Sequence, residues 1–225
     1  MLALFVPLLA LTGNAAWGED LHRIRAGAER GDPGAQYDLG TIYQEGVLVR
    51  SDLAEARRWW RKAADHGHSG AQYNMGILYA RGDGVSQDMQ EAVKWFLKAA
   101  EQGHSGAQYG LGIACALGDG TPKNMQEALS WWRKAADHGH SDAQLNLGIA
   151  YARGDGIGQD RAEALKWYRQ AATQGNVKAQ FNLGVAYAKG DGVPQDREES
   201  RKWLSRSASQ GYGPAQRLLK ELDQQ

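Results

Sequence analysis

Two histidine pairs, each beside an aspartate, are the side chains of this chain best suited to hold a metal ion. They are His66 and His68 after Asp65, and His138 and His140 after Asp137. Imidazole and carboxylate groups are common zinc ligands, so each pair could bind a metal weakly at an exposed loop. However, His68, His104 and His140 follow one another at intervals of 36 residues, which would hold them too far apart to share one ion. We therefore expect solvated loop histidines, with no metal and no other cofactor.

Other short motifs resemble functional signatures without meeting their requirements. Gly67-His68-Ser69-Gly70 resembles a nucleophile elbow, but it lacks the final glycine and the preceding strand that such an elbow needs. Arg81-Gly82-Asp83 spells an integrin-type tripeptide, yet Lys189-Gly190-Asp191 fills the same slot, and Gly and Asp favour turns on their own account. No nucleophile, base and acid stand out as a set, so we predict that the chain is not an enzyme.

The same motifs recur because nearly the whole chain is built on one repeat. The tripeptide Ala-Gln followed by an aromatic residue or Leu returns every 36 residues without slippage. Its copies begin at Ala35, Ala71, Ala107, Ala143 and Ala179, and Ala215 begins a sixth copy in which Arg217 replaces the aromatic residue. An unbroken period of this length indicates a repeat architecture, in which each repeat packs on its neighbours.

Each repeat is predicted to contain two helices. In the second copy, helically spaced apolar residues predict a helix A over about 70–81, and the glycines of Gly82-Asp83-Gly84 end it. Ser69 with Gln72 three residues later predicts a capping box at its start.

A helix B is predicted over about 89–102, with Asp88 as its N-cap. The same N-cap position is held in the other copies by Asp52, Asn124, Asp160 and Asp196. A large residue of helix B should pack on a small residue of helix A, because a mid-helix Gly costs up to about 1 kcal/mol relative to Ala and needs a compensating close approach. The two columns are Trp59, Trp95, Trp131, Trp167 and Trp203, and Gly40, Gly76, Gly112, Gly148 and Gly184.

This pattern resembles the Sel1-like repeat family of the tetratricopeptide-like superfamily. The fourth copy carries Ala143-Gln144-Leu145-Asn146-Leu147-Gly148-Ile149-Ala150-Tyr151, then Gly154-Asp155-Gly156-Ile157, then Ala164-Leu165-Lys166-Trp167-Tyr168-Arg169-Gln170-Ala171-Ala172. The resemblance implies an all-α fold, a right-handed α-solenoid of antiparallel helix pairs that serves as an interaction scaffold. Five repeats are expected at 33–68, 69–104, 105–140, 141–176 and 177–212, between a capping half-repeat at 19–32 and a capping helix at 213–225.

The N-terminus and the composition bear on location and partners. Residues 1–18 are predicted to be a signal peptide, because Leu2 to Leu11 is an apolar run too short to span a bilayer, and Ala16 and Gly18 are small residues at −3 and −1 of a cleavage site after Gly18. The alternative is a buried apolar N-terminal helix. We expect a periplasmic or secreted monomer with no membrane span after cleavage. Lys+Arg and Asp+Glu number 26 each, so no basic field is present to attract nucleic acid.

By analogy with tetratricopeptide proteins, helix A is expected to line the concave face and to bind a protein or peptide there. The candidate contacts are Tyr37, Tyr73, Asn74, Arg81, Tyr109, Asn146, Arg153, Phe181, Asn182 and Lys189. The aromatic residues could instead pack between neighbouring A helices, and the sequence leaves both interpretations open.

The predicted function is therefore a non-catalytic scaffold for a protein or peptide partner, which could serve a regulatory role. The alternative is a cell-wall or β-lactam-related hydrolase or ligand-binding protein, since some secreted family members carry a cysteine pair in each repeat and have been linked to penicillin binding. This chain has Cys115 alone, and that activity is not carried over to it.

Overall fold

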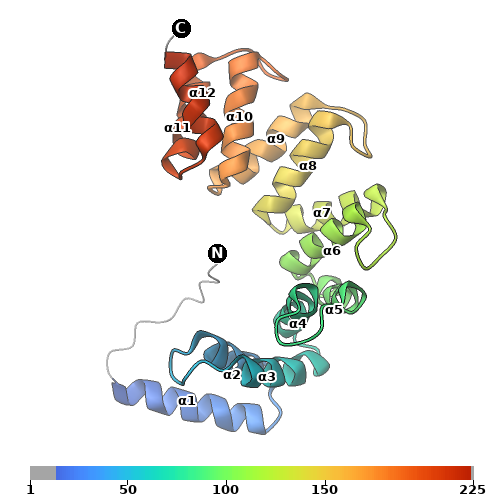
Figure 1. Cartoon of the computed structure of the whole chain (residues 1–225), viewed down its shortest axis with the longest axis vertical. Coiled ribbons are helices and arrows are strands. Elements are labelled where there is room, and N and C mark those ends of the chain that lie inside the picture. The colour runs from blue at the N-terminus through green and yellow to red at the C-terminus, as the bar shows by residue number, and fades with distance from the viewer. Residues whose placement is uncertain (1–13, 224–225) are drawn as a thin grey trace. The chain divides into compact units, whose positions relative to one another are not determined.

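The computed structural model describes residues 14–223, and in that range the chain is all-α (Figure 1). Within these residues there are 12 helices and no strand, as the sequence predicts. The helices are α1 (Asn14–Glu29), α2 (Pro33–Glu45), α3 (Leu53–Asp65), α4 (Ser69–Arg81), α5 (Met89–Glu101), α6 (Ser105–Leu117), α7 (Met125–Asp137), α8 (Ser141–Arg153), α9 (Arg161–Thr173), α10 (Val177–Lys189), α11 (Arg197–Ser209) and α12 (Gly213–Asp223).

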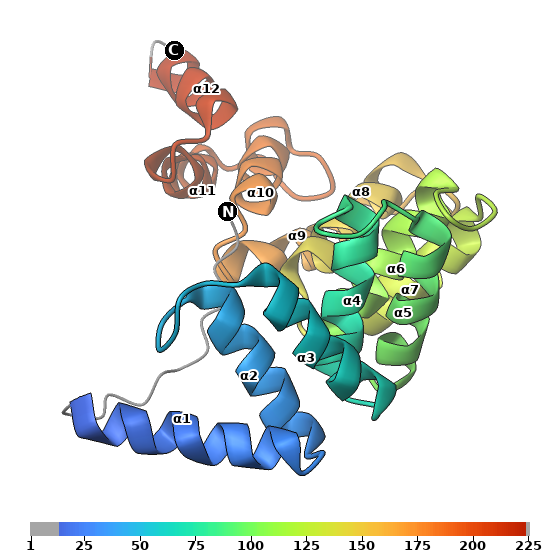
Figure 2. The same cartoon turned by 60° about the horizontal axis from the view of Figure 1, so that its bottom comes forward.

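The helices form two compact units, Met1–Asp88 and Met89–Gln225, which we call unit 1 and unit 2. Within each unit, successive helices run antiparallel and pack on one another (Figure 2). In unit 2 the closest pairs are α6 with α7, α8 with α9 and α10 with α11, which are the A and B helices of single repeats.

The starts of the B helices follow the sequence prediction. The Asp52 side chain accepts hydrogen bonds from the backbone N–H groups of Ala54 and Glu55, at 2.9 and 3.0 Å. The carbonyl oxygen of the Asn124 side chain and the Asp160 carboxylate accept from the equivalent N–H groups of α7 and α9. Such a cap satisfies donors that the first helical turn cannot pair, and is worth about 1 kcal/mol.

The A helices begin differently from the prediction, because the residue before Ser69 is the N-cap. His68 Nδ1 accepts the backbone N–H of Ala71 at 3.2 Å, and His104 and His140 cap α6 and α8 in the same way. The predicted capping box at Ser69 and Gln72 was therefore wrong. The A helix of each full repeat does end at a glycine, as predicted; Gly118, for example, adopts the left-handed conformation with φ of 79°.

The glutamine of each Ala-Gln tripeptide instead joins two successive repeats. Gln144 is 4% exposed, and its side-chain amide donates to the Ala136 carbonyl of the preceding helix B at 3.2 Å. Its side-chain oxygen accepts from Gln174 at the end of its own helix B, at 2.8 Å. The hydrogen bond from the glutamine side-chain amide to the backbone carbonyl eight residues earlier recurs in the other copies, at Gln36, Gln72, Gln108, Gln180 and Gln216.

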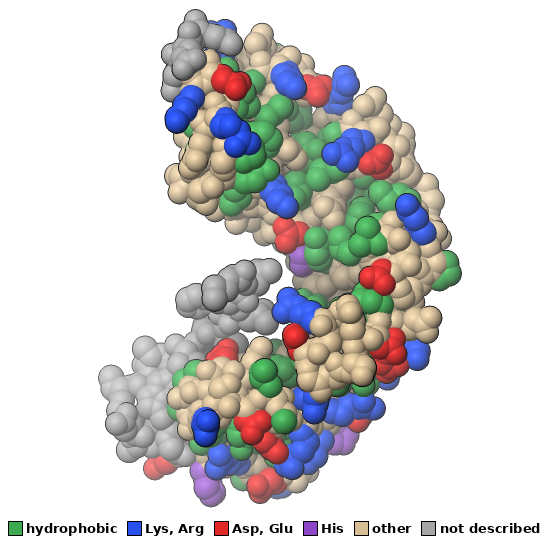
Figure 3. Space-filling view, viewed as in Figure 1, with side chains coloured by type: hydrophobic (Ala, Val, Ile, Leu, Met, Phe, Trp, Pro, Cys, Tyr) green, Lys and Arg blue, Asp and Glu red, His purple; other side chains and the backbone are tan. Residues whose placement is uncertain are grey.

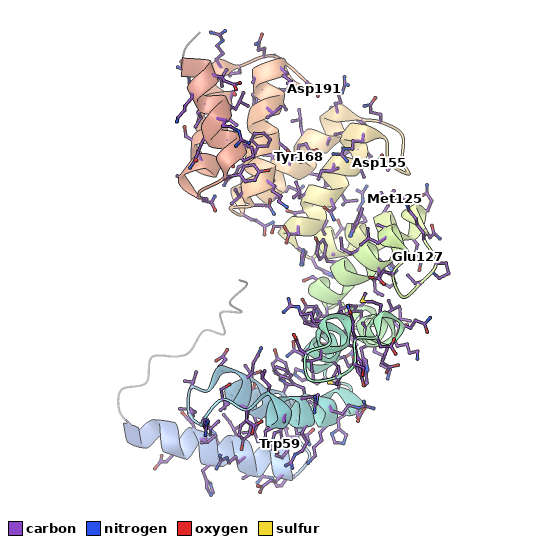
Figure 4. The ribbon with its side chains drawn as sticks, in the orientation of Figure 1. Trp59, Met125, Glu127, Asp155, Tyr168 and Asp191 are labelled. Carbon is purple, nitrogen blue, oxygen red and sulfur yellow. The ribbon has the colours of Figure 1, made fainter. Side chains whose placement is uncertain are left out.

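Helix A and helix B of one repeat meet at a glycine, but the large partner is one residue later than predicted. A Cβ atom placed on Gly112 would lie 2.2 Å from the Trp132 ring, and one on Gly148 would lie 2.5 Å from Tyr168. The tryptophans that were predicted to face these glycines pack on the preceding repeat instead. Trp167, for example, belongs to a hydrophobic cluster with residues of α7 and α8. Trp59, labelled in Figure 4, packs with Ala28 and Leu39 in the same manner.

The terminal helices use the same contacts as the repeats. Ala28 of α1 is 1% exposed and packs in the cluster that contains Leu39. Most of the predicted signal peptide, residues 1–13, lies outside the described residues, and the rest of it forms the start of α1. Export of the chain therefore stays a prediction.

Candidate functional site

The histidines that could hold a metal are parts of the helix ends. His68 and His140 cap A helices, and their rings stack on Tyr37 and Tyr109 with ring centroids 4.5 Å apart. His138 Nδ1 lies 3.0 Å from the Gln108 side-chain oxygen, and His66 has the same contact with Gln36. Within residues 14–223 there is no group of three or more His, Cys, Asp or Glu side chains placed to hold a metal ion.

The capping histidines should make the fold sensitive to acid. Burial lowers the pKa of His68 and of His140. The negative charges of Asp38 and Asp32 near His68, and of Asp142 near His140, oppose this shift without reversing it. A lowered folded-state pKa means that the unfolded chain binds the proton first, so this stability is present above about pH 6.5 and is lost as the pH falls. Protonation also removes the Nδ1 acceptor, which is worth about 1 kcal/mol per cap. We expect the urea midpoint to drop between pH 7.5 and pH 5.5.

Asn176 provides the control for this prediction. It holds the same position before α10, and its side-chain oxygen accepts the Ala179 N–H at 3.0 Å. In the triple variant His68→Asn, His104→Asn, His140→Asn, the asparagines should keep the helix caps. The drop in the urea midpoint between pH 7.5 and pH 5.5 should therefore be smaller than in the parent protein. If it loses stability below pH 6.5 as steeply as the parent protein, the capping histidines are not its source.

The predicted aromatic contacts are largely occupied by packing between helices. Tyr37 and Tyr109 are half-buried against histidine rings, and Phe181 makes an edge contact with Tyr212 at 5.3 Å between ring centroids. Leu145, at the same repeat position, is 5% exposed. These contacts favour the packing interpretation for this column over direct contact with a ligand.

The asparagine column lines open cavities in unit 2, and Phe181 and Tyr109 of the aromatic column also line one cavity each. Asn146 lines a cavity of about 230 Å³ between α6, α7 and α8, which we call the first pocket. Asn182 lines a cavity of about 170 Å³ between α8, α9 and α10, which we call the second pocket. Asn146 also borders a third cavity of about 350 Å³ with Tyr109, Asp142 and Lys178.

The first and second pockets are the same site in successive repeats. Each is lined by the large helix B residue, the asparagine, a β-branched residue and the turn aspartate. These are Trp132, Asn146, Ile149 and Asp155 in the first pocket, and Tyr168, Asn182, Val185 and Asp191 in the second. We call the surface of α6, α8 and α10 that carries the two pockets the A-helix face. Figure 3 shows hydrophobic side chains at the surface of unit 2 between charged ones.

The second pocket is the more polar of the two. Arg161 forms an ion pair with Asp191 at 2.9 Å. Burial raises the pKa of Tyr168 to about 12, although Arg153 and a hydrogen bond with Asn182 oppose that shift. Arg153 and Asn182 therefore both lie near Tyr168.

The remaining predicted residues fall elsewhere or are not brought together. Tyr73, Asn74 and Arg81 lie on α4 in unit 1, where Tyr73 and Asn74 are half-buried and Arg81 is exposed. Lys189 is exposed at the end of α10. The sequence analysis did not single out Ile149, Val185, Asp155 or Asp191 as binding residues. A signal was present, because both pairs are 36 residues apart, as Asn146 and Asn182 are.

The single cysteine offers no nucleophile. Cys115 is 2% exposed, and burial, together with the charge of Glu127 and a hydrogen bond to it, raises the pKa of its thiol. A protonated, enclosed thiol is a poor nucleophile, so it serves as a packing residue. Separately, no helix within residues 14–223 is both long and apolar enough to cross a bilayer.

Comparison with known proteins identifies the repeat. A family model described as Sel1 repeat matches residues 33–68, 69–104, 105–140, 141–176 and 177–212. No curated protein matches the chain.

Solved structures agree with this match. The crystal structure of c5321, a protective antigen of uropathogenic Escherichia coli with an SLR fold, is 40% identical with a TM-score of 0.84; the alignment covers 90% of this chain and 44% of c5321. This chain thus spans less than half of c5321. A Sel1 repeat protein from Oxalobacter formigenes is 36% identical with a TM-score of 0.79, over 93% of this chain and 87% of that one.

A third structure shows similarity of fold alone. The immunity protein Pa5087 from Pseudomonas aeruginosa is 22% identical with a TM-score of 0.56, over 88% of this chain and 76% of that one. Sel1 repeat proteins are generally non-catalytic helical scaffolds for protein interaction. On the repeat, the fold and these matches, the chain belongs to the Sel1 repeat family.

Proposed function

We propose that this protein is a non-catalytic interaction protein that binds an extended peptide segment on the A-helix face of unit 2. The observation that carries this proposal is the pair of pockets one repeat apart, each with one asparagine beside apolar side chains. An extended peptide presents side chains at regular intervals, so a regularly repeated pocket suits it. Asn side chains have both donors and acceptors, which can pair with the backbone of such a peptide.

The sizes of the first and second pockets suit single side chains of a peptide better than a drug-sized molecule. Sites for drug-sized ligands typically span about 300–1,000 Å³. The first and second pockets measure about 230 and 170 Å³, so each accommodates one side chain rather than a whole ligand. The Sel1 repeat family supports the same conclusion, because its members generally act through protein interaction.

The proposed contacts are a revised set of those predicted from the sequence. Asn146, Asn182 and Arg153 are retained, and Lys189 remains a proposed contact of the same kind. Asn74 and Arg81 lie on α4 in unit 1 and stay predictions outside this surface. Of the aromatic residues, Phe181 lines the second pocket and is retained as a proposed contact, whereas Tyr37 and Tyr109 stack on histidine rings and support the shape of the helix ends. We propose that the peptide belongs to a protein of the bacterial envelope, since residues 1–18 have the composition of a signal peptide.

A displayed library of random dodecapeptides provides a test. We expect selection on the wild-type protein to enrich specific peptides. Their affinity, measured by fluorescence polarisation, should be about tenfold or more lower for the double variant Asn146→Ala/Arg153→Ala than for the wild type. The loss corresponds to about 1.4 kcal/mol, the size of one or two lost hydrogen bonds.

The matched control changes exposed residues of B helices, Ser130→Ala/Lys166→Ala, and should bind as the wild type does. Circular dichroism establishes that both variants are folded. Equal affinity for all three proteins would remove the A-helix face as the binding surface.

A further inference from the structure

The two pockets differ in charge, and we infer that the first pocket selects a lysine or arginine side chain of the bound peptide. This inference rests on the proposed function, because it specifies which peptides the A-helix face accepts.

Comparison of equivalent positions carries the inference. Where the second pocket has Arg161, the first pocket has Met125. Arg153, at the end of α8, lies close enough to Tyr168 for its charge to oppose the rise in the pKa of the Tyr168 hydroxyl. The residue one repeat earlier is Leu117, which lines the first pocket and is 69% exposed. The first pocket thus lacks the arginine that pairs with the aspartate of the second pocket, and it keeps the aspartate.

The aspartates of the two pockets are in different states. The Asp191 carboxylate is 2.9 Å from Arg161 and is neutralised by it. The Asp155 carboxylate has no ion-pair or hydrogen-bond partner among residues 14–223, and the residue is exposed. Figure 4 labels Asp155 and Asp191. The role of Asp155 in the turn is carried by its backbone, whose N–H donates to the Ala150 carbonyl at 3.0 Å. The carboxylate is therefore left for a ligand.

The rest of the first pocket suits the stem of a long basic side chain. Ile113, Leu117, Met125, Trp132 and Ile149 give it apolar walls. Lys and Arg side chains lay their methylene groups along such surfaces and keep the charged end in water. A charge-assisted hydrogen bond to Asp155 would then fix that end. An acidic side chain would place two negative charges together and would be rejected.

The test compares the random dodecapeptide library on four proteins: wild type, Asp155→Asn, Met125→Arg and Asp191→Asn. We expect wild type to enrich Lys or Arg at one fixed peptide position. Asp155→Asn removes the charge without changing the turn, and Met125→Arg provides the partner that Asp191 already has, so both should lose the basic preference. Asp191→Asn is the control and should retain it.

Affinities then separate the possible outcomes. Replacing the selected Lys or Arg of the peptide by norleucine should weaken binding to wild type about tenfold and should leave binding to Asp155→Asn unchanged. Enriched peptides without a basic residue, or with a basic residue that Asp155→Asn still prefers, would overturn the inference while the proposed function stands. A library that enriches no peptide on any of the proteins would overturn both.

Discussion

Gly112→Leu should lower the free energy of unfolding by about 3 kcal/mol or more. A Cβ atom on Gly112 would lie 2.2 Å from the ring of Trp132, which is itself 5% exposed. The ring has no room to move away without opening the interface of α6 and α7, and a leucine adds three carbons beyond the Cβ. Urea denaturation followed by circular dichroism measures the effect.

Gly110, two residues earlier in the same helix, gives the matched control. A Cβ atom there would meet the Phe96 ring at 3.4 Å, an ordinary contact. Gly110→Ala should therefore be neutral or gain up to about 1 kcal/mol from helix propensity, whereas Gly112→Ala should destabilise the fold despite the same gain. If both alanine variants behave alike, close approach is not the reason for the glycine column.

Gln144→Leu should lower the free energy of unfolding by roughly 2 kcal/mol. The substitution removes the hydrogen bonds of Gln144 with Ala136 and Gln174, and each such bond contributes about 1 kcal/mol. The loss should also reduce the cooperativity of unfolding, because these bonds join successive repeats. The measurement is again urea denaturation, with the slope of the transition compared as well as its midpoint.

Gln170→Leu is the control for Gln144→Leu, since Gln170 is exposed on α9. It should change stability by no more than about 0.5 kcal/mol. A Gln144 variant as stable as the Gln170 variant would show that the buried amides do not hold the repeats together.

The elements that could be predicted from the sequence are those that local contacts determine. The B-helix caps depend on an Asp or Asn and the N–H groups two or three residues later, so Asp52 and Asp160 were predicted correctly. The 36-residue period likewise predicted where the two helices of each repeat lie, because each pair is formed by residues of one repeat. It did not determine the partner of each glycine, because helix B carries two adjacent large residues, such as Trp131 and Trp132, and periodicity does not distinguish which one faces helix A.

Longer-range features required the structure. Ser69 and Gln72 have the spacing of a capping box, but the partner of Gln72 is the carbonyl of Ala64 in the preceding repeat. The pockets themselves required the structure, since each combines residues of two successive A helices and one B helix. The sequence places the asparagines beside the aromatic column, whereas it places Asp155 and Asp191 in the turns after the A helices.

Photo-crosslinking from the A-helix face tests the central claim most directly. A benzophenone amino acid at Leu117, which is exposed beside the first pocket, should crosslink to a library-selected peptide, and mass spectrometry should place the adduct within a few residues of the peptide's basic side chain. The same amino acid at Ser130, exposed on α7, should give little adduct. Equal or stronger crosslinking from Ser130 would contradict peptide binding on the A-helix face.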